Sequence, residues 1–271
     1  MSFHLLQPDR VTPVDLKVRL ALSEDAGSGC RYIRVEADQK IPQVRSGQFF
    51  QLRLSGVLDP LLGRPFSSIR AGENFADFVF RMVGRGTDIL GSLPSGSRLD
   101  LRGPCGNGFP LPQGKRLILV AGTLGIAPFL EIPARFGGTF SVISILGVPG
   151  RGWEDFAKWC RERNPEIRLI SDDGTIGRCG TAIDEAMSVF RQGDEVWSCG
   201  PNPMLKNLQV IKSAGCERLL VSLEKRMACG IGGCLGCSVQ TRYGPQRVCV
   251  EGPVFEWGEV LWNEDVGRHG R

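Results

Sequence analysis

The chain has 271 residues, 42% of them hydrophobic and 23% charged, with a formal net charge of +4 at pH 7. This length suggests about two compact domains, and the mixed charges argue against a nucleic-acid-binding protein. No apolar run reaches the roughly 18–20 residues of a membrane span, and the N-terminus lacks the pattern of a signal peptide. We therefore expect a cytoplasmic protein whose ten cysteines are free thiols or ligands.

Residues 10–103 predict an all-β domain. Apolar, β-branched and aromatic residues gather in short segments that are separated by Gly, Pro, Asn or Asp. These segments are residues 14–22, 30–37, 47–54, 75–84 and 97–103. Because no helical segment interrupts their near-regular spacing, we expect a small antiparallel β-barrel.

Two motifs in this part of the chain indicate a flavin site. "RPFS" places Arg64 beside a proline in an expected turn, which alone is often only a solvated cation. Further on, Gly86 followed by Thr87 predicts a helix N-terminus with a hydroxyl cap, which is suited to a pyrophosphate. Together with "GPCGNGF" at 103–109, the layout resembles that of ferredoxin-reductase flavoproteins.

From residue 116 onward the pattern changes to alternating strands and helices. We expect strands at 116–122, 139–147, 167–173, 194–200 and 218–224, and helices at 126–136, 152–163, 181–192 and 201–215. This alternation predicts a parallel α/β sheet with crossover connections.

Two turns on one edge of that sheet suggest a dinucleotide cleft. Gly122 and Gly125 follow the first strand, and Cys199, Gly200 and Pro201 end a later one. Glycines at the carboxyl ends of parallel strands allow the backbone to approach a bound nucleotide. Each turn alone is also typical of an ordinary strand–helix connection, but the pair favours a nicotinamide cofactor.

Four cysteines gather near the end of the chain. Cys229, Cys234 and Cys237 follow the spacing C-x4-C-x2-C, and Cys249 comes after eleven further residues. Zinc ribbons usually have two similar cysteine pairs, whereas three cysteines on one loop with a distant fourth are typical of plant-type [2Fe-2S] proteins. The loop glycines suit a backbone whose N–H groups point at sulfur. We predict a [2Fe-2S] cluster, with a structural zinc or free thiols as the alternatives.

The run of motifs resembles the electron-transfer subunits of the class 1B, NAD-dependent dihydroorotate dehydrogenases. The resemblance covers about residues 10–260 and is most specific in the cysteine segment. The matching stretches are "RPFSSI", "VFRMVGRGT", "GPCGNGFP", "GIAP", "LISDDGTIGRCG", "WSCGPNPML" and "LEKRMACGIGGCLGCSVQT" with "RVCVEGPVF".

The resemblance implies FAD, one [2Fe-2S] cluster and NAD as cofactors. It also implies a role in pyrimidine biosynthesis and an FMN-containing catalytic subunit as partner, in a heterotetramer with two copies of each. By match, flavin contacts fall on Arg64, Pro65, Phe66, Ser67, Val79, Phe80 and Arg81, pyrophosphate contacts on Gly86 and Thr87, and the cluster ligands on Cys229, Cys234, Cys237 and Cys249. No acid–base pair is expected, and the two histidines, His4 and His269, lie near the termini.

One motif departs from the family pattern. The family usually has three consecutive glycines after the first strand of the α/β sheet, whereas this chain has Thr123 and Leu124 after Gly122, and Pro133 interrupts the following helix. A bulkier turn and a shorter helix are expected to narrow the dinucleotide cleft.

We expect an FAD-binding barrel at 1–106, an NAD-binding α/β domain at 107–224 and a [2Fe-2S] domain at 225–271. The alternatives are an electron-transfer subunit of an NADH-dependent ferredoxin:NADP oxidoreductase or of a sulfhydrogenase, and, from another class, a zinc-binding interaction module.

Overall fold

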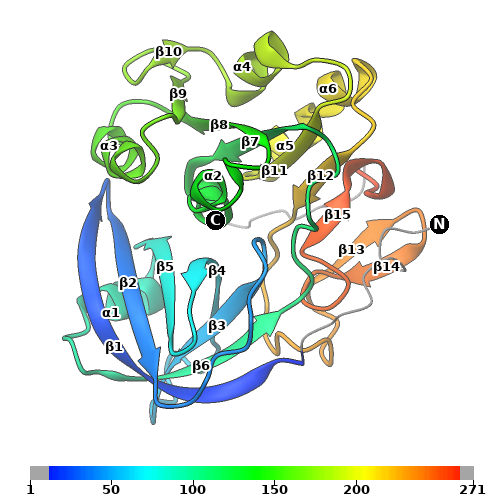
Figure 1. The fold of residues 1–271 in the computed structure, drawn as a ribbon. Coiled ribbons are helices and arrows are strands. Elements are labelled where there is room, and N and C mark those ends of the chain that lie inside the picture. The colour runs from blue at the N-terminus through cyan, green and yellow to red at the C-terminus, as the bar shows by residue number, and fades with distance from the viewer. Residues whose placement is uncertain (1–11, 263–271) are drawn as a thin grey trace.

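The structure, a computed structural model, describes residues 12–262. Its chain forms a closed antiparallel barrel, a mostly parallel sheet flanked by helices, and a C-terminal segment beside both (Figure 1). The predicted combination of an antiparallel barrel with a parallel α/β domain is confirmed.

Alternating burial explains the barrel. In its first strand Leu16, Val18 and Leu20 are buried, while the residues between them face outward. The strand order is β1-β2-β5-β4-β3-β6. The elements are β1 (Val14–Gly27), β2 (Cys30–Ala37), β3 (Phe49–Leu54), β4 (Arg64–Ala71), β5 (Phe75–Arg81), α1 (Arg85–Ser92) and β6 (Arg98–Cys105). Arg64 and Pro65 therefore begin a strand, so the expected turn at these residues is wrong, because the chain already turns in the loop before β4.

The second sheet has the order β10-β9-β8-β7-β11-β12-β15 and is parallel from β10 to β12. Its strands are β7 (Arg116–Gly122), β8 (Ser141–Val148), β9 (Arg168–Ser171), β10 (Arg178–Cys179), β11 (Glu195–Cys199), β12 (Leu219–Ser222) and β15 (Val254–Glu256). Side chains of β7 are buried on both faces, which explains its continuous apolar sequence.

The helices around this sheet are short. They are a 3-10 helix (Thr123–Phe129), α2 (Ile132–Phe136), α3 (Glu154–Arg163), α4 (Ala182–Val189), α5 (Asn202–Asn207) and α6 (Gln209–Ser213). The expected helix at 126–136 is thus split, as is the one at 201–215, which breaks at Leu208. No helix within residues 12–262 is long and apolar enough to cross a bilayer.

The C-terminal segment is more regular than its sequence indicates. It contains a hairpin of β13 (Ser238–Thr241) and β14 (Gly244–Arg247), followed by β15, which pairs antiparallel with β12. Through β15 the segment therefore shares the α/β sheet. The predicted domain boundaries remain predictions.

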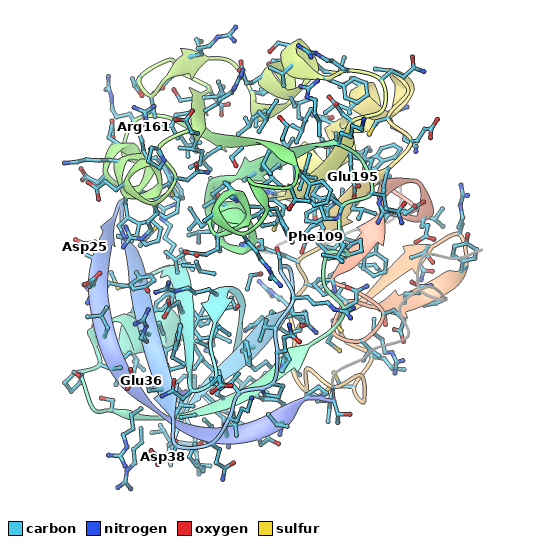
Figure 2. The ribbon with its side chains drawn as sticks, viewed as in Figure 1. Asp25, Glu36, Asp38, Phe109, Arg161 and Glu195 are labelled. Carbon is cyan, nitrogen blue, oxygen red and sulfur yellow. The ribbon has the colours of Figure 1, made fainter. Side chains whose placement is uncertain are left out.

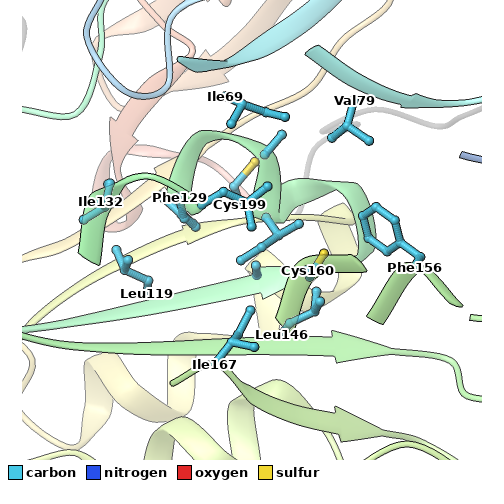
Figure 3. Close-up of a cluster of buried hydrophobic side chains, with 14 of the residues drawn as sticks. Ile69, Val79, Leu119, Phe129, Ile132, Leu146, Phe156, Cys160, Ile167 and Cys199 are labelled. Carbon is cyan, nitrogen blue, oxygen red and sulfur yellow. The ribbon is translucent and has the colours of Figure 1, made fainter. Parts of the chain in front are cut away.

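Barrel and α/β sheet share one hydrophobic cluster. Ile69 and Val79 of the barrel belong to the same cluster as Phe129 of the α/β part (Figure 3). The β1–β2 hairpin, on which Asp25 lies, reaches helix α3, on which Arg161 lies (Figure 2). There the hydroxyl of Ser28 accepts a hydrogen bond from the first turn of α3, at Phe156 N (3.3 Å). This hydrogen bond adds a polar contact to the hydrophobic cluster that the barrel shares with the α/β part.

Candidate functional site

A cavity of about 1070 Å³ lies between the barrel and the α/β sheet. This volume is at the upper end of the roughly 300–1,000 Å³ of ordinary ligand pockets, so a large ligand fits. The cavity gathers these residues of the predicted flavin site: Arg64, Pro65, Phe66, Ser67, Val79, Phe80, Arg81 and Thr87. Residues up to 23 positions apart in the sequence are thus brought to one place by β4, β5 and the start of α1.

The cavity combines an apolar wall with cations. Phe66 and Phe80 are stacked with their ring centroids 4.9 Å apart, and both line the cavity. At another wall the guanidinium of Arg81 lies 4.6 Å from the ring centroid of Trp153, which belongs to the α/β part. Sequence reasoning missed Trp153, because its place at the barrel depends on the packing of α3. An aromatic wall beside fixed cations suits a planar ring system that carries phosphates.

Helix α1 presents its N-terminus beside this cavity, with Gly84 at the N-cap. A Cβ atom on Gly86 would lie 2.3 Å from Nε of Arg64, so glycine allows this guanidinium to approach the helix end. The expected hydroxyl cap is wrong: Thr87 lies inside the first turn, accepts a hydrogen bond from Val83 N (3.0 Å) and donates one to Gly84 O (2.8 Å). Backbone N–H groups of the first turn and the Arg64 side chain are nevertheless placed to bind an anion.

The last wall of the cavity leads directly to the cysteines. Ser222 to Met227 line it, and Cys229 follows two residues later. Two barrel side chains hold this junction: Gln51 Nε2 donates to Ala228 O (3.2 Å), and Arg102 Nη1 donates to Cys229 O (3.3 Å). The cysteine loop is therefore attached to the barrel at its first cysteine.

The four predicted cysteines form two neighbouring pairs. The sulfurs of Cys237 and Cys249 are 3.3 Å apart, and the backbone N–H of Cys234 donates to the sulfur of Cys229 at 3.4 Å. Over residues 12–262, no group of three His, Cys, Asp or Glu side chains converges as the ligand set of a single ion. A structural zinc needs four ligands around one ion, whereas in a [2Fe-2S] cluster with four cysteine ligands each iron takes one pair. The close sulfurs of Cys237 and Cys249, with Cys229 and Cys234 adjacent to each other, are consistent with the predicted cluster.

The environment favours the thiolate form at Cys229 and Cys237. Burial raises the pKa of Cys229, but hydrogen bonds from the backbone N–H groups of Ile231 and Cys234 outweigh it and lower this pKa to about 7. The hydrogen bond with Cys249 lowers the pKa of Cys237 to about 6 and raises the pKa of Cys249. Because thiolates are the iron ligands, this donor set fits the predicted cluster.

The predicted dinucleotide residues are packed against one another. A Cβ on Gly125 would lie 2.1 Å from the carbonyl oxygen of Cys199, and one on Gly122 would lie 2.7 Å from Pro201 Cδ. The side chain of Cys199 is buried in the shared hydrophobic cluster (Figure 3). The turn therefore presents its backbone rather than the Cys199 sulfur, and the role of Cys199 in cofactor binding remains a prediction.

Thr123 and Leu124, which stand where the family usually has glycines, face the cavity. Thr123 and Leu124 line it, and Thr123 adopts a left-handed φ of 49°. A β-branched residue rarely adopts this conformation, so the turn is strained.

The structure places an acidic residue near the end of β8. Asp173 follows β9 in the chain, and its Oδ2 accepts a hydrogen bond from Arg151 N (2.9 Å), just beyond β8. Gly150 leaves room for this carboxylate, because a Cβ there would lie 1.9 Å from Oδ1. The sequence signal for this residue is the "SDDG" turn that follows β9, and not the segment that follows β8.

The expected histidines, His4 and His269, lie outside the described residues. The expectation of no acid–base pair in this chain remains a prediction.

Comparisons with known proteins agree on one family. The model of the iron-sulfur cluster binding domain of dihydroorotate dehydrogenase B matches residues 224–261. The chain is 36% identical over 220 residues to a "Dihydroorotate dehydrogenase B (NAD(+)), electron transfer subunit" of Caldanaerobacter subterraneus subsp. tengcongensis, covering 80% of this chain and 87% of that protein. It is 34% identical over 234 residues to the protein of the same name from Clostridium acetobutylicum, covering 82% and 88%.

Solved structures share the fold. The structure of an NADH-dependent reduced ferredoxin-NADP oxidoreductase matches with a TM-score of 0.77 at 23% identity, over 95% of this chain and 92% of that one. Phthalate dioxygenase reductase matches with a TM-score of 0.62 at 16% identity, over 89% and 95%. The fold is thus that of modular reductases, and the sequence identity to the curated relatives decides the family. The chain belongs to the electron transfer subunits of dihydroorotate dehydrogenase B (NAD(+)).

Proposed function

We propose that this chain passes electrons between an FMN-containing dihydroorotate dehydrogenase catalytic subunit and NAD+, through a [2Fe-2S] cluster and FAD. FAD supplies the required chemistry when bound, since it exchanges two electrons with a nicotinamide and single electrons with a cluster. The protein's own task is to hold these groups close together and to exclude competing reactions.

One observation carries the proposal: the wall of the cavity continues into the cysteine loop. Met227 lines the cavity and Cys229 is a predicted ligand, and two residues of chain span at most about 7 Å. The two sites are therefore adjacent, as electron transfer between them requires.

Within the cavity, the residues divide by chemistry. We assign the isoalloxazine to the wall formed by Phe66, Phe80 and Val79, with Pro65, Ser67 and Arg81 around it, and the pyrophosphate to Arg64, Gly86 and Thr87 at the start of α1. Arg64 is suited to this role because a guanidinium binds phosphate oxygens through two parallel hydrogen bonds.

For the nicotinamide cofactor we assign the edge formed by the turns at Gly122, Gly125, Gly200 and Pro201, with Cys199 contributing backbone only. Asp173 supports NAD over NADP, because a carboxylate at the end of β8 accepts hydrogen bonds from ribose hydroxyls and repels a 2′-phosphate.

The name "electron transfer subunit" of the relatives implies a partner. We propose the FMN-containing catalytic subunit in a heterotetramer with two copies of each chain, acting in pyrimidine biosynthesis in the cytoplasm. All ten cysteines are free in the structure, which suits a reducing compartment.

The test is to co-express the full chain with a dihydroorotate dehydrogenase catalytic subunit encoded in the same genome. We expect the two to purify together with iron, sulfide, FAD and FMN, and dihydroorotate to reduce NAD+ only when both are present. The Cys249→Ser variant is the control, because the catalytic subunit should then still reduce an artificial acceptor while NAD+ reduction is lost.

Two results would contradict the proposal. One is a colourless, zinc-containing preparation, which would favour an interaction module. The other is a flavin- and iron-loaded chain that neither binds the catalytic subunit nor supports dihydroorotate-driven NAD+ reduction.

A further inference from the structure

A row of polar side chains crosses three barrel strands beside the cysteine loop. Asp15 of β1 is paired in register with Arg102 of β6, and Arg102 with Gln51 of β3. The guanidinium of Arg102 donates to both carboxylate oxygens of Asp15, at 2.7 and 3.0 Å. This bidentate ion pair fixes the position of the positive charge.

The same guanidinium contacts the cysteine loop. Its third nitrogen, Nη1, donates to the carbonyl oxygen of Cys229 at 3.3 Å. Gln51 bonds the preceding carbonyl, at Ala228, and its amide fills the space that a Cβ on Gly230 would need (2.6 Å). A fixed positive charge therefore lies against the residue that carries the first cysteine.

Resting on the proposed function, we propose that the Arg102–Asp15 ion pair sets the reduction potential of the iron–sulfur cluster held by this loop. Reduction adds one negative charge to the cluster, and a nearby cation stabilises that charge and raises the potential. Asp15 acts in the opposite direction. Arg102 is thus a tuning and positioning residue and does not itself transfer electrons.

The exposure of the Arg102 and Asp15 side chains decides how strongly each charge changes the reduction potential. The Arg102 side chain is 36% exposed and the Asp15 side chain 72%. Water and salt screen the more exposed charge more strongly. The hydrogen bonds of the Asp15 carboxylate described above run to Arg102 and not to the cysteine loop. Removing the arginine should therefore change the potential more than removing the aspartate.

The barrel provides a matched control row. One step further along the same strands, Lys17 and Arg53 are paired in register with Asp100 and both donate to it. Arg53 carries the same charge as Arg102 on the neighbouring strand β3, but its ion pair lies about 7 Å further along the ladder. Arg53→Gln therefore controls for the loss of any barrel cation.

The experiment is a dye-mediated redox titration of the full, cofactor-loaded chain, with the reduced cluster measured by electron paramagnetic resonance. At the wild-type midpoint, Arg102→Gln should lower the ratio of reduced to oxidised cluster roughly two- to tenfold. Asp15→Asn should raise it by less, Arg102→Lys should stay near wild type because it keeps the charge, and Arg53→Gln should change it less than Arg102→Gln. High salt should reduce the shifts of Arg102→Gln and Asp15→Asn.

A role in holding the loop alone predicts a different pattern. If Arg102 and Asp15 only hold the loop, Arg102→Gln and Asp15→Asn should both loosen it and shift the reduction potential in the same direction. Arg102→Lys should then not restore the wild-type potential. That pattern would overturn the inference. Unchanged potentials in cluster-loaded variants would also overturn it and leave the proposed function intact. A wild-type chain without iron and sulfide would contradict the proposed function itself. If Arg102→Gln does not fold, Arg102→Lys and Asp15→Asn decide the question, because the inference predicts a midpoint near wild type for the first and a raised midpoint for the second.

Discussion

The cysteine loop and the turn after β7 are both rich in glycine, yet their glycines have different surroundings. In the cysteine loop, a Cβ on Gly233 would meet no atom within 4 Å, and one on Gly236 would meet only the sulfur of Cys234 at 3.6 Å. In the turn after β7, a Cβ on Gly125 would overlap the backbone of Cys199. In the same loop Gly230 and Gly232 are packed, because a Cβ there would lie 2.6 Å from Gln51 Cδ and from Val250 Cγ2 respectively. Only Gly233 and Gly236 thus leave open space beside the cysteines, whereas the turn after β7 allows two strand ends to pack together.

This contrast separates two meanings of a glycine motif. A glycine in open space and a glycine whose missing side chain is replaced by a neighbour can be told apart by the atoms that a Cβ would meet. Both kinds look alike in the sequence. The cysteine loop contains both kinds, whereas the glycines of the turn after β7 are packed, so this turn offers a ligand mainly its backbone.

The largest expected effect is at the cysteine loop. Cys249→Ser removes one sulfur of the buried Cys237–Cys249 pair, and a hydroxyl is a poor iron ligand. We expect most of the iron and sulfide to be lost while FAD is retained, measured by metal analysis and flavin absorbance. The matched control is Cys179→Ser, which changes an exposed cysteine outside the loop and should leave the iron content unchanged. Full cluster content in Cys249→Ser would show that the ligand assignment is wrong.

The next largest effect is in the cavity. Arg64→Ala removes a charged donor worth about 1.5–3 kcal/mol, so we expect FAD affinity to fall roughly 10- to 100-fold. The measurement is a fluorescence titration of the flavin-free chain with FAD. Arg85→Ala is the control, since Arg85 forms an exposed ion pair with Asp59 and should change the affinity much less. Equal losses in both variants would argue against a specific pyrophosphate contact.

In the turn after β7, we expect a substitution of glycine to lower the stability of the fold. Gly125→Ala places a methyl group 2.1 Å from the carbonyl oxygen of Cys199, which forces the two strand ends apart and should lower the free energy of unfolding by about 1–3 kcal/mol. Denaturant unfolding of the purified chain measures this. Gly138→Ala should be nearly neutral, because a Cβ there meets nothing within 4 Å. A stable Gly125→Ala variant with weakened NADH binding would instead make Gly125 a ligand contact.

The smallest effect is expected at the neighbouring position. Thr123→Gly relieves a left-handed φ of 49°, which costs a non-glycine residue about 1–2 kcal/mol, but adds about 0.5–1 kcal/mol of chain entropy. The net gain in stability should be about 0.5 kcal/mol, and the smaller side chain should lower the KM for NADH modestly. Unfolding and steady-state kinetics with an artificial electron acceptor test both effects. A loss of stability would mean that Thr123 makes contacts that offset its strain.

Local patterns allowed much of this architecture to be predicted. Alternating burial in β1 and a continuous apolar β7 gave the two sheet types, and the cysteine spacing gave the ligand candidates. The sequence could not show that β15 joins the sheet, because Val254–Glu256 is too short for its pairing with β12 to be read from periodicity.

Long-range contacts account for most of what was missed. Trp153 reaches Arg81, Asp173 reaches the end of β8, and Arg102 reaches Cys229 only after the chain has folded. The burial of Cys199 likewise depends on the 3-10 helix and the strands that pack around it. At an open strand end the same residue would be accessible to solvent.

The central claim is that electrons pass between a pyridine nucleotide and the cysteine-bound cluster by way of the cavity. The most direct test is an anaerobic titration of the full, cofactor-loaded chain with NADH, followed by flavin absorbance and by electron paramagnetic resonance. The account predicts that flavin absorbance is bleached and that the signal of a reduced [2Fe-2S] cluster appears in the same titration, and that Cys249→Ser shows the bleaching alone. Flavin bleaching in the wild-type chain without any cluster signal, with iron and sulfide present, would contradict it.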